Sequence, residues 1–313
     1  MTRLIATVSI AVFLVAGGSA LAADNARPNK VSFYFAAHED DWQLFMNPSA
    51  FQDVVAGARK TVFVHVTAGD GGLGLGSAGR KHPLYRAREN GAEQAMRFMV
   101  NADHSPGPES DTHITLNGHS IYRVNYGSTV GYFLRVADGN LDGSGFYDTG
   151  FQSLKHLHDG APMLAAVDAS TVYHGWNDLV KTVRAIVDHE RGQAAQVQIN
   201  VAETNARVNP QDHSDHLMTA AAALDAVSDM PCVRRVFYVD YASAKMPENI
   251  SADQRDLVSS VFAVTIAGVL AYDHGLSWRH YDKSYVGRSY FRVQDGVGQC
   301  SPARTEVAAA LKR

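Results

Sequence analysis

Two apolar segments joined by a helical pattern constrain the fold of this chain more than any other feature of its sequence. Residues 31–37 and 61–67 are rich in aromatic and β-branched residues, as buried strands are. Between them, residues 48–59 carry apolar side chains at helical spacing. A strand, a helix and a second strand in close succession predict a βαβ unit in which the two strands are parallel.

The second half of the chain contains the same elements. Residues 196–202 and 235–239 predict strands, and residues 178–190 and 217–227 predict helices. We therefore expect an α/β fold, a Rossmann-like three-layer sandwich with a mostly parallel sheet. In such a sheet, ligand sites lie beyond the carboxyl ends of the strands.

One stretch departs from the parallel pattern. Within residues 112–136, Asn117 and Gly118 form a strong turn signal between two strand-like runs, and a third run follows at 130–136. This predicts a small antiparallel β insertion. Because no linker separates it from the rest, we expect a single domain over residues 23–313.

The first 22 residues have the features of a signal peptide. Arg3 gives a positive start, residues 4–15 form an apolar run, and residues 20–22 (Ala-Leu-Ala) form a small-residue cleavage site. The run is shorter than the roughly 20 residues that span a bilayer, and we read no later stretch as long and apolar enough. The sequence predicts an exported protein, periplasmic or secreted, that begins near Ala23 and has no transmembrane anchor.

The charge balance limits the partners. Lys and Arg number 28 against 32 Asp and Glu, which gives a formal net charge of −4, and no basic run is present. Nucleic acids and anionic membrane surfaces both need a basic patch, so neither is an expected partner.

The chain has two cysteines, Cys232 and Cys300. An oxidising compartment would favour a disulfide between them. Two buried free thiols are the alternative, and the sequence leaves it open.

A cluster of polar residues follows the first predicted strand. His38, Glu39, Asp40 and Asp41 stand at its carboxyl end, where a ligand site is expected. His38 and Asp41 are three residues apart, so one turn brings them to one side, and an imidazole with a carboxylate suits zinc or a similar divalent metal. The alternative is that these acids cap a helix N-terminus.

A second cluster, residues 213–216 (His-Ser-Asp-His), opens a predicted helix. Taken alone, it would also suit a solvated loop with an Asp cap. Two such clusters at two exposed strand ends predict a catalytic zinc site, which takes three protein ligands and keeps one position open. Either Asp215 or Asp212 would orient an imidazole from behind.

Four segments resemble the motifs of the PIG-L (LmbE-like) de-N-acetylases. Residues 37–41 resemble the family's Ala-His-Pro-Asp-Asp, and residues 213–216 resemble its His-Pro-Asp-His. Residues 67–72 and 86–89 are similar to its Thr-x-Gly-Asp and Arg-x-x-Glu segments. The resemblance covers residues 31 to about 240, with the motifs in the family's order.

The resemblance implies a zinc-dependent hydrolase with the metal on His38, Asp41 and His216. It also implies that Asp40 is the general base and that His213 acts at the oxyanion or the departing amine. Family members remove acyl groups from N-acetylglucosamine-type substrates. The implied partner is therefore an amino sugar or glycan.

Some positions near these motifs need separate interpretation. Glu39 replaces the family's Pro, and Trp42 replaces a usual Glu, so Trp42 is expected to shape the pocket wall and thereby the substrate. Arg88, or else Arg86, would hold a sugar hydroxyl or a phosphate. Arg86 has the family spacing to Glu89, whereas Arg88 is adjacent to it. As the alternative, both arginines are surface cations on a solvated helix.

Two further motifs are interpreted as loops. Residues 74–79 match the G-x-G-x-x-G pattern but open no helix, which favours a loop beside the active site over dinucleotide binding. Asp138, Asn140 and Asp142 copy the start of a calcium loop, but Thr149 stands where a bidentate Glu is needed. A turn is favoured there over structural calcium.

These observations predict an exported zinc-dependent hydrolase that removes an N-acyl group, above all N-acetyl, from an amino sugar or glycan by metal-activated water. One alternative is an amidase with the same site that acts on a non-sugar conjugate. Another is a catalytically silent carbohydrate-binding protein, against which Asp40 argues because binding alone needs no general base. The glycan, the acyl group and the oligomeric state stay open.

Overall fold

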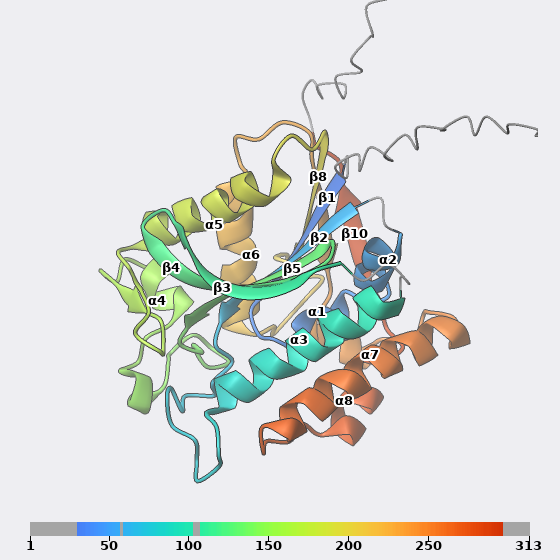
Figure 1. Ribbon diagram of the computed structural model, residues 1–313, viewed down its shortest axis with the longest axis horizontal. Helices are drawn as coiled ribbons and strands as arrows, with labels where there is room; N and C mark the ends of the chain where they lie inside the picture. The colour runs from blue at the N-terminus through green and yellow to red at the C-terminus, as the bar shows by residue number, and fades with distance from the viewer. Residues whose placement is uncertain (1–29, 57–58, 103–106, 297–313) are drawn as a thin grey trace, which may run out of the picture.

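The computed structural model describes residues 30–56, 59–102 and 107–296. Its centre is an eight-stranded sheet in the order β10-β9-β8-β1-β2-β5-β4-β3 (Figure 1). Five adjacent strands, from β9 to β5, are parallel, whereas β10 and β4 run antiparallel to them. The strands are β1 (Lys30–Ala36), β2 (Arg59–Thr67), β3 (Glu109–Leu116), β4 (His119–Tyr126), β5 (Thr129–Val136), β8 (Gln196–Ala202), β9 (Val233–Tyr238) and β10 (Phe291–Gln294), with β6 (Leu164–Ala165) and β7 (Val172–Tyr173) in a separate small sheet.

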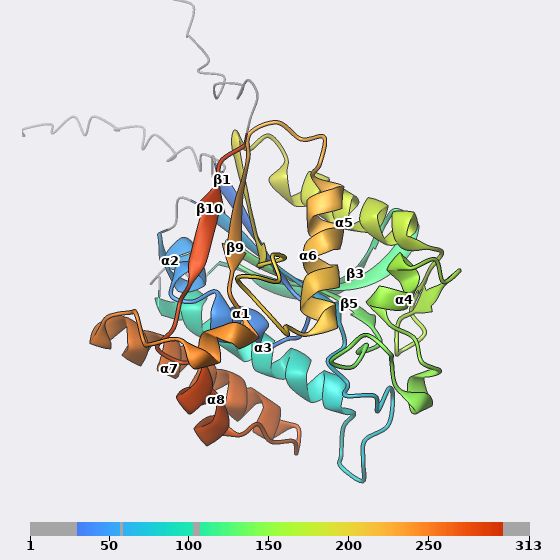
Figure 2. The same cartoon turned by 180° about the vertical axis from the view of Figure 1, so that it is seen from behind.

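Helices cover both faces of the sheet (Figures 1 and 2). Side chains alternate across β1, so that Phe33 and Phe35 pack with α4, α5 and α6, while Tyr34 packs with α1, α2, α3 and α7 on the other face. This arrangement confirms the predicted three-layer α/β sandwich. The helices are α1 (Asp41–Phe45), α2 (Ser49–Val55), α3 (Leu84–Ala102), α4 (Leu154–His158), α5 (Trp176–Arg191), α6 (Ser214–Ala226), α7 (Ala252–Ala271) and α8 (Trp278–Ser284), with short 3₁₀ turns at Tyr147–Thr149 and Tyr241–Lys245.

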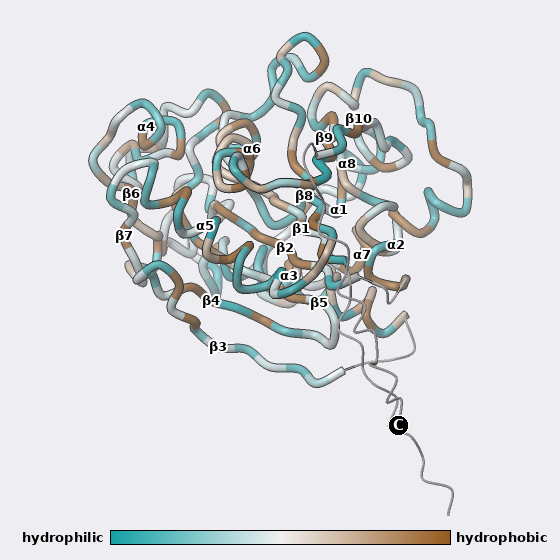
Figure 3. The backbone as a smooth tube through the Cα atoms, turned by 90° about the horizontal axis from the view of Figure 1, so that it is seen from above, coloured by the Kyte–Doolittle hydropathy of each residue, from teal (hydrophilic) through white to brown (hydrophobic). Residues whose placement is uncertain are grey.

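The β insertion is continuous with the main sheet. β3 and β4 form the hairpin around Asn117 and Gly118, and β5 pairs antiparallel with β4. β5 also pairs in parallel with β2, a second pairing that the sequence interpretation missed. Its carboxyl end therefore reaches the same edge of the sheet as those of β1 and β2. The outermost strand, β3, is exposed and mostly hydrophilic (Figure 3).

Helix α7 corrects one expectation. Within the described residues, it is long and apolar enough to cross a membrane by length and composition, although no later stretch was expected to be. It lies close against α3, since a Cβ added to Gly268 would be 2.8 Å from the Cα of Gly91. In the same way, a Cβ added to Gly91 would be 2.8 Å from the carbonyl oxygen of Thr265. Helices α3 and α7 therefore pack together with their backbones in close contact.

Two sequence predictions concern residues outside the described ranges. The predicted signal peptide, residues 1–22, lies there, so export stays a prediction. Cys232 is disulfide-bonded. Cys300 lies outside the described ranges, and the pairing of the two cysteines stays a prediction.

A buried histidine links the first helix to the sheet. His65, on β2, is fully buried. Its Nδ1 donates to the Tyr132 carbonyl oxygen at 3.2 Å, and its Nε2 accepts from Trp42 Nε1 at 3.1 Å. Burial lowers the pKa of His65 to about 4, so the ring is neutral at neutral pH.

This histidine should make folding pH-dependent. Because its folded pKa lies below the unfolded value of about 6.5, its contribution is fully present above pH 6.5 and is lost as the pH falls toward 4. Between about pH 7.5 and about pH 5, the free energy of unfolding of the wild type should fall by about 2 kcal/mol more than that of His65→Gln. Urea unfolding at both pH values measures this, with the exposed His158→Gln as control. Parallel losses in wild type and His65→Gln would contradict it.

Candidate active site

Three buried side chains bring one donor atom each to a single point at the carboxyl edge of the sheet. His38 follows β1, Asp41 begins α1, and His216 lies in the first turn of α6. Asp41 Oδ1 lies 3.5 Å from His38 Nδ1 and 3.3 Å from His216 Nε2, and the two nitrogens are 3.3 Å apart. Corners of a zinc tetrahedron with ligand bonds of 2.0–2.1 Å are about 3.4 Å apart. These donors therefore fit three corners of a zinc site.

Hydrogen bonds fix the direction of these donors. His216 Nδ1 donates to Asp212 Oδ1 at 2.9 Å, which turns the Nε2 lone pair toward the other two donors. The backbone N–H of His38 donates to Asp41 Oδ2 at 2.7 Å and leaves Oδ1 free to bind. Of the two aspartates considered for orienting an imidazole, Asp212 is thus the one that holds His216.

The local charge favours a cation at this point. Burial lowers the pKa of His38 and His216, but the surrounding carboxylates, of which Asp41 contributes most, together outweigh it and raise both pKa values well above the usual one. Asp212 raises the pKa of His216 further. A site that draws protons onto both imidazoles will also bind a metal cation in their place.

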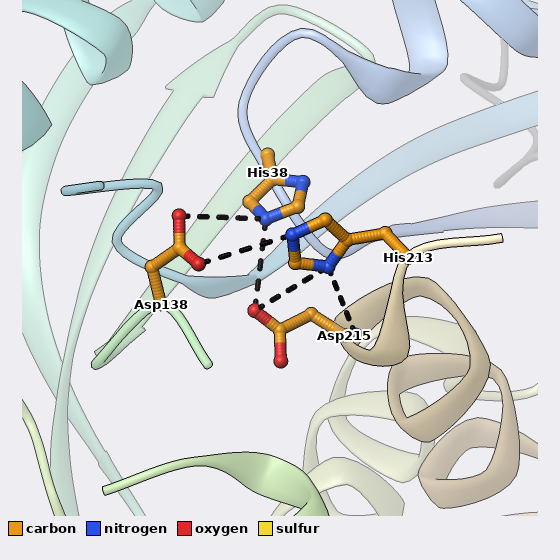
Figure 4. Close-up of side chains that lie close together, drawn as sticks. All are labelled: His38, Asp138, His213 and Asp215. Carbon is orange, nitrogen blue, oxygen red and sulfur yellow. Dashed lines mark hydrogen bonds and ion pairs between the residues drawn. The ribbon is translucent and has the colours of Figure 1, made fainter. Parts of the chain in front are cut away.

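A second group of side chains surrounds the other nitrogen of His38 (Figure 4). His38 Nε2 lies 3.6 Å from Asp215 Oδ2 and 3.8 Å from Asp138 Oδ2, and His213 Nε2 lies 4.0 Å from Asp138 Oδ1. These four residues could also hold a metal. Their donors are farther apart than a zinc tetrahedron requires, so we assign the metal site to His38, Asp41 and His216.

Asp138 is a site residue that the sequence interpretation missed. The turn favoured over calcium is present, since Asp138 Oδ1 accepts from Asn140 N at 2.9 Å and Asp142 Oδ1 accepts from Ser144 N at 3.0 Å. Asp138, however, faces His38 and His213 instead of a calcium loop. Its place directly beyond β5 was the available signal, because that strand ends at the same edge as β1.

His213 presents a hydrogen-bond donor to the cleft. Its Nδ1 accepts from the backbone N–H of Asp215 at 3.1 Å, so the proton of the neutral ring lies on Nε2, which faces Asp138. Burial, together with charge on His38 and His216, lowers the pKa of His213 to about 3. The neutral ring suits donation to an oxyanion better than delivery of a proton to an amine.

Arg88 joins the site, and Arg86 does not. Arg88 Nε donates to Glu39 Oε2 at 3.1 Å, and its Nη2 donates to Asp40. Asp40 occupies the N-cap position of α1 without a side-chain cap hydrogen bond, so capping does not explain it. Arg86 instead pairs with Glu89. Burial raises the pKa of Glu39 to about 8 even though Arg88 opposes the shift.

Gly69 makes room for the pair formed by Arg88 and Glu39. At φ +50°, an added Cβ would lie 2.5 Å from Glu39 Oε2 and 2.7 Å from Arg88 Nε. Gly69→Ala should therefore displace Arg88 and cost roughly 2–3 kcal/mol of stability. Gly79→Ala is the matched control, because Gly79 has φ +78° but nothing within 4 Å of its added Cβ. Equal losses in thermal unfolding for both variants would contradict the clash.

Trp42 does not line the cleft in the part of the chain that the structure describes, contrary to expectation. The side chain is fully buried, packs on Phe63 and donates to His65. The residues of helix α1 that line the cleft instead of Trp42 are Asp41, Leu44 and Phe45.

The cleft at the donors is small and has a mixed lining. Its volume is about 110 Å³. Its lining includes the polar residues Asp40, Arg88, Asp138 and His213, and also aromatic and apolar side chains. The latter are Leu44, Phe45, Tyr241 and Tyr281.

No family model matches the chain, and no curated protein matches it. Among solved structures, it is similar to the N,N'-diacetylchitobiose deacetylase from Pyrococcus horikoshii in complex with its inhibitor MPG. The identity is 15%, the TM-score is 0.46, and the match covers 85% of this chain and 84% of that chain. The functional assignment of the cleft therefore depends on its own side chains.

Proposed function

We propose that this protein is an exported, zinc-dependent hydrolase that removes an N-acyl group, above all N-acetyl, from an amino sugar or glycan. One observation carries the proposal. The three donors of His38, Asp41 and His216 have zinc spacing. Two of them, His38 and Asp41, line one cleft together with the carboxylate of Asp40 and the imidazole of His213. The resemblance of residues 37–41 and 213–216 to de-N-acetylase motifs supports the same chemistry.

The roles of the residues follow from their atoms. A divalent metal on the three donors would polarise the amide carbonyl. It would also lower the pKa of water, so that the water loses a proton at neutral pH and attacks that carbonyl. Asp40, held by Arg88, accepts the proton of the attacking water and returns it to the nitrogen of the departing amine when the C–N bond breaks. His213 donates its Nε2–H to the oxygen on which negative charge develops, and Asp138 faces that nitrogen.

The cleft itself supports a small polar acyl amine as substrate. Its volume of about 110 Å³ leaves little space beyond the acyl group and the atoms next to the amide. Tyr241 and Tyr281 offer aromatic faces, and Arg88 offers a donor to a hydroxyl. An amidase acting on a non-sugar conjugate would use the same donors. The test of the proposal therefore includes a non-sugar conjugate among the substrates.

Acetate release from a panel of N-acetylated sugars, oligosaccharides and one N-acetylated thiol conjugate tests the proposal. We expect release from the sugars, its loss after complete chelation, and its recovery with added zinc, because no Ser or Cys nucleophile motif offers a metal-free route. Undiminished release from metal-free protein would refute the mechanism. If acetate were released from the thiol conjugate and from none of the sugars, the protein would be an amidase for a non-sugar conjugate.

A further inference from the structure

A second cleft opens beside the catalytic one. Its volume is about 430 Å³, so the catalytic cleft of about 110 Å³ is about a quarter of its size. It is lined by the Gly-rich loop at residues 73–75, by residues 148–150 and by residues 165–167. Ala137, which directly precedes Asp138, also lines it.

One buried carboxylate joins the walls of the two clefts. Asp70 Oδ1 accepts from the backbone N–H of Asp138 at 2.9 Å, and its Oδ2 accepts from that of Gly74 at 2.7 Å. Asp138 lines the catalytic cleft and Gly74 lines the second one. The two clefts are therefore neighbours that share a fixed wall.

Exposed apolar side chains belong to, or directly adjoin in sequence, two of the segments that line this second cleft. Tyr147 and Phe151 stand on either side of the lining segment 148–150, with exposed fractions of 82% and 54%. Their rings meet edge-on with centroids 6.0 Å apart. Leu75, on the Gly-rich loop, is 60% exposed. Apolar side chains gathered in water beside a cleft mark a binding surface more often than chance.

The loop that carries the two rings is firmly held. Phe151 has a φ of +56°, a left-handed conformation that is costly for an aromatic residue. Its N–H donates to the Phe146 carbonyl oxygen at 2.8 Å, and its own carbonyl oxygen accepts from His156 Nδ1 at 2.8 Å. A Cβ added to Gly145 would lie 2.5 Å from the Phe151 carbonyl carbon. The rings are thus presented by a preorganised loop.

We propose that the second cleft is a carbohydrate subsite, which holds sugar units next to the one whose amide lies at the metal donors. A pyranose ring has an apolar C–H face that suits Tyr147 or Phe151, and its rim of hydroxyls suits the carboxylate of Asp148. The preferred substrate is then a chain of N-acetylated sugars and not a single one. The substrate class rests on the proposed function, whereas the binding of a chain does not.

Binding of N-acetylglucosamine and of its dimer, tetramer and hexamer tests the subsite. Calorimetry on zinc-loaded Asp40→Asn protein measures binding without turnover. We expect the hexamer to bind about tenfold more tightly than the monomer. Adding Tyr147→Ala and Phe151→Ala should remove this gain and leave monomer binding unchanged. The control is Phe291→Ala. Phe291 is 50% exposed and lies on β10, an edge strand that four other strands of the sheet separate from β5.

The outcomes separate the subsite from the hydrolase. Equal affinity for every chain length, or the same loss in the Phe291→Ala control, overturns the subsite. If the wild type releases acetate from monomer and hexamer with equal efficiency, the hydrolase stands and the subsite falls. If binding rises with chain length but no acetate is ever released, the subsite stands and the hydrolase falls.

Discussion

Replacing Asp40 with asparagine should lower turnover by about 10²- to 10⁴-fold, the usual contribution of a general base. Asn keeps the shape of the side chain and an oxygen that accepts from Arg88, but it cannot take a proton from water. Asp40 is a buried partner of Arg88, and Arg88 keeps Glu39 as its second partner, so we expect some loss of stability but a folded protein. Steady-state rates, bound zinc and thermal unfolding of the same preparation measure the three quantities.

The control for this variant is Asp229→Asn, which removes an exposed carboxylate paired with Arg184. It should keep full activity. If Asp40→Asn turned over as fast as the parent, or lost its zinc, Asp40 would not be the base.

Removing any one of the three donors should empty the metal site and abolish hydrolysis. His38→Ala, Asp41→Ala and His216→Ala each leave two donors at a point where zinc takes three protein ligands. We expect about one zinc per chain in the wild type and close to none in each variant, measured by elemental analysis after dialysis.

Replacing Asp212, which holds His216 but is not one of the three donors, should weaken zinc binding without abolishing it. Asp212→Asn keeps all three donors but weakens the hold on His216, so zinc affinity should fall by about 10- to 100-fold. The exposed His158→Ala is the control and should keep its zinc. Full zinc occupancy in His216→Ala would show that the metal site is wrongly assigned.

Much of the sheet could be predicted because strand signals are local. β1, β2, β8 and β9 lie close to the predicted segments, and each reads as a short run of β-branched or aromatic residues. The partner of a strand is not local information. β5 was therefore assigned to the hairpin, although it also pairs with β2.

The same distinction explains the site. His38 with Asp41, and His213 with His216, are pairs at a spacing of three residues, so each pair could be recognised from its own segment. Asp138 comes from a third segment, as a single residue, and only the β2–β5 pairing brings it there.

Helices α3 and α7 gave weaker signals for a physical reason. Their backbones approach most closely at Gly91 and Gly268, and glycine is a poor helix former. Large apolar side chains of both helices, such as Met96 and Phe262, nevertheless belong to the same core cluster. Glu89, on the same helix as Gly91, is buried in a pair with Arg135. A buried acid on a helix reads as a surface position until its partner is known.

The polar outer strand β3 has a consequence for handling the protein in concentrated solution. A sheet edge offers unpaired backbone groups to any passing strand, and such edges start aggregation when they are apolar and flat. β3 begins with Glu-Ser-Asp-Thr-His and exposes all five of these side chains. Charge and hydration at that edge oppose the addition of a further strand, so changes that make residues 109–113 apolar would trade solubility for self-association.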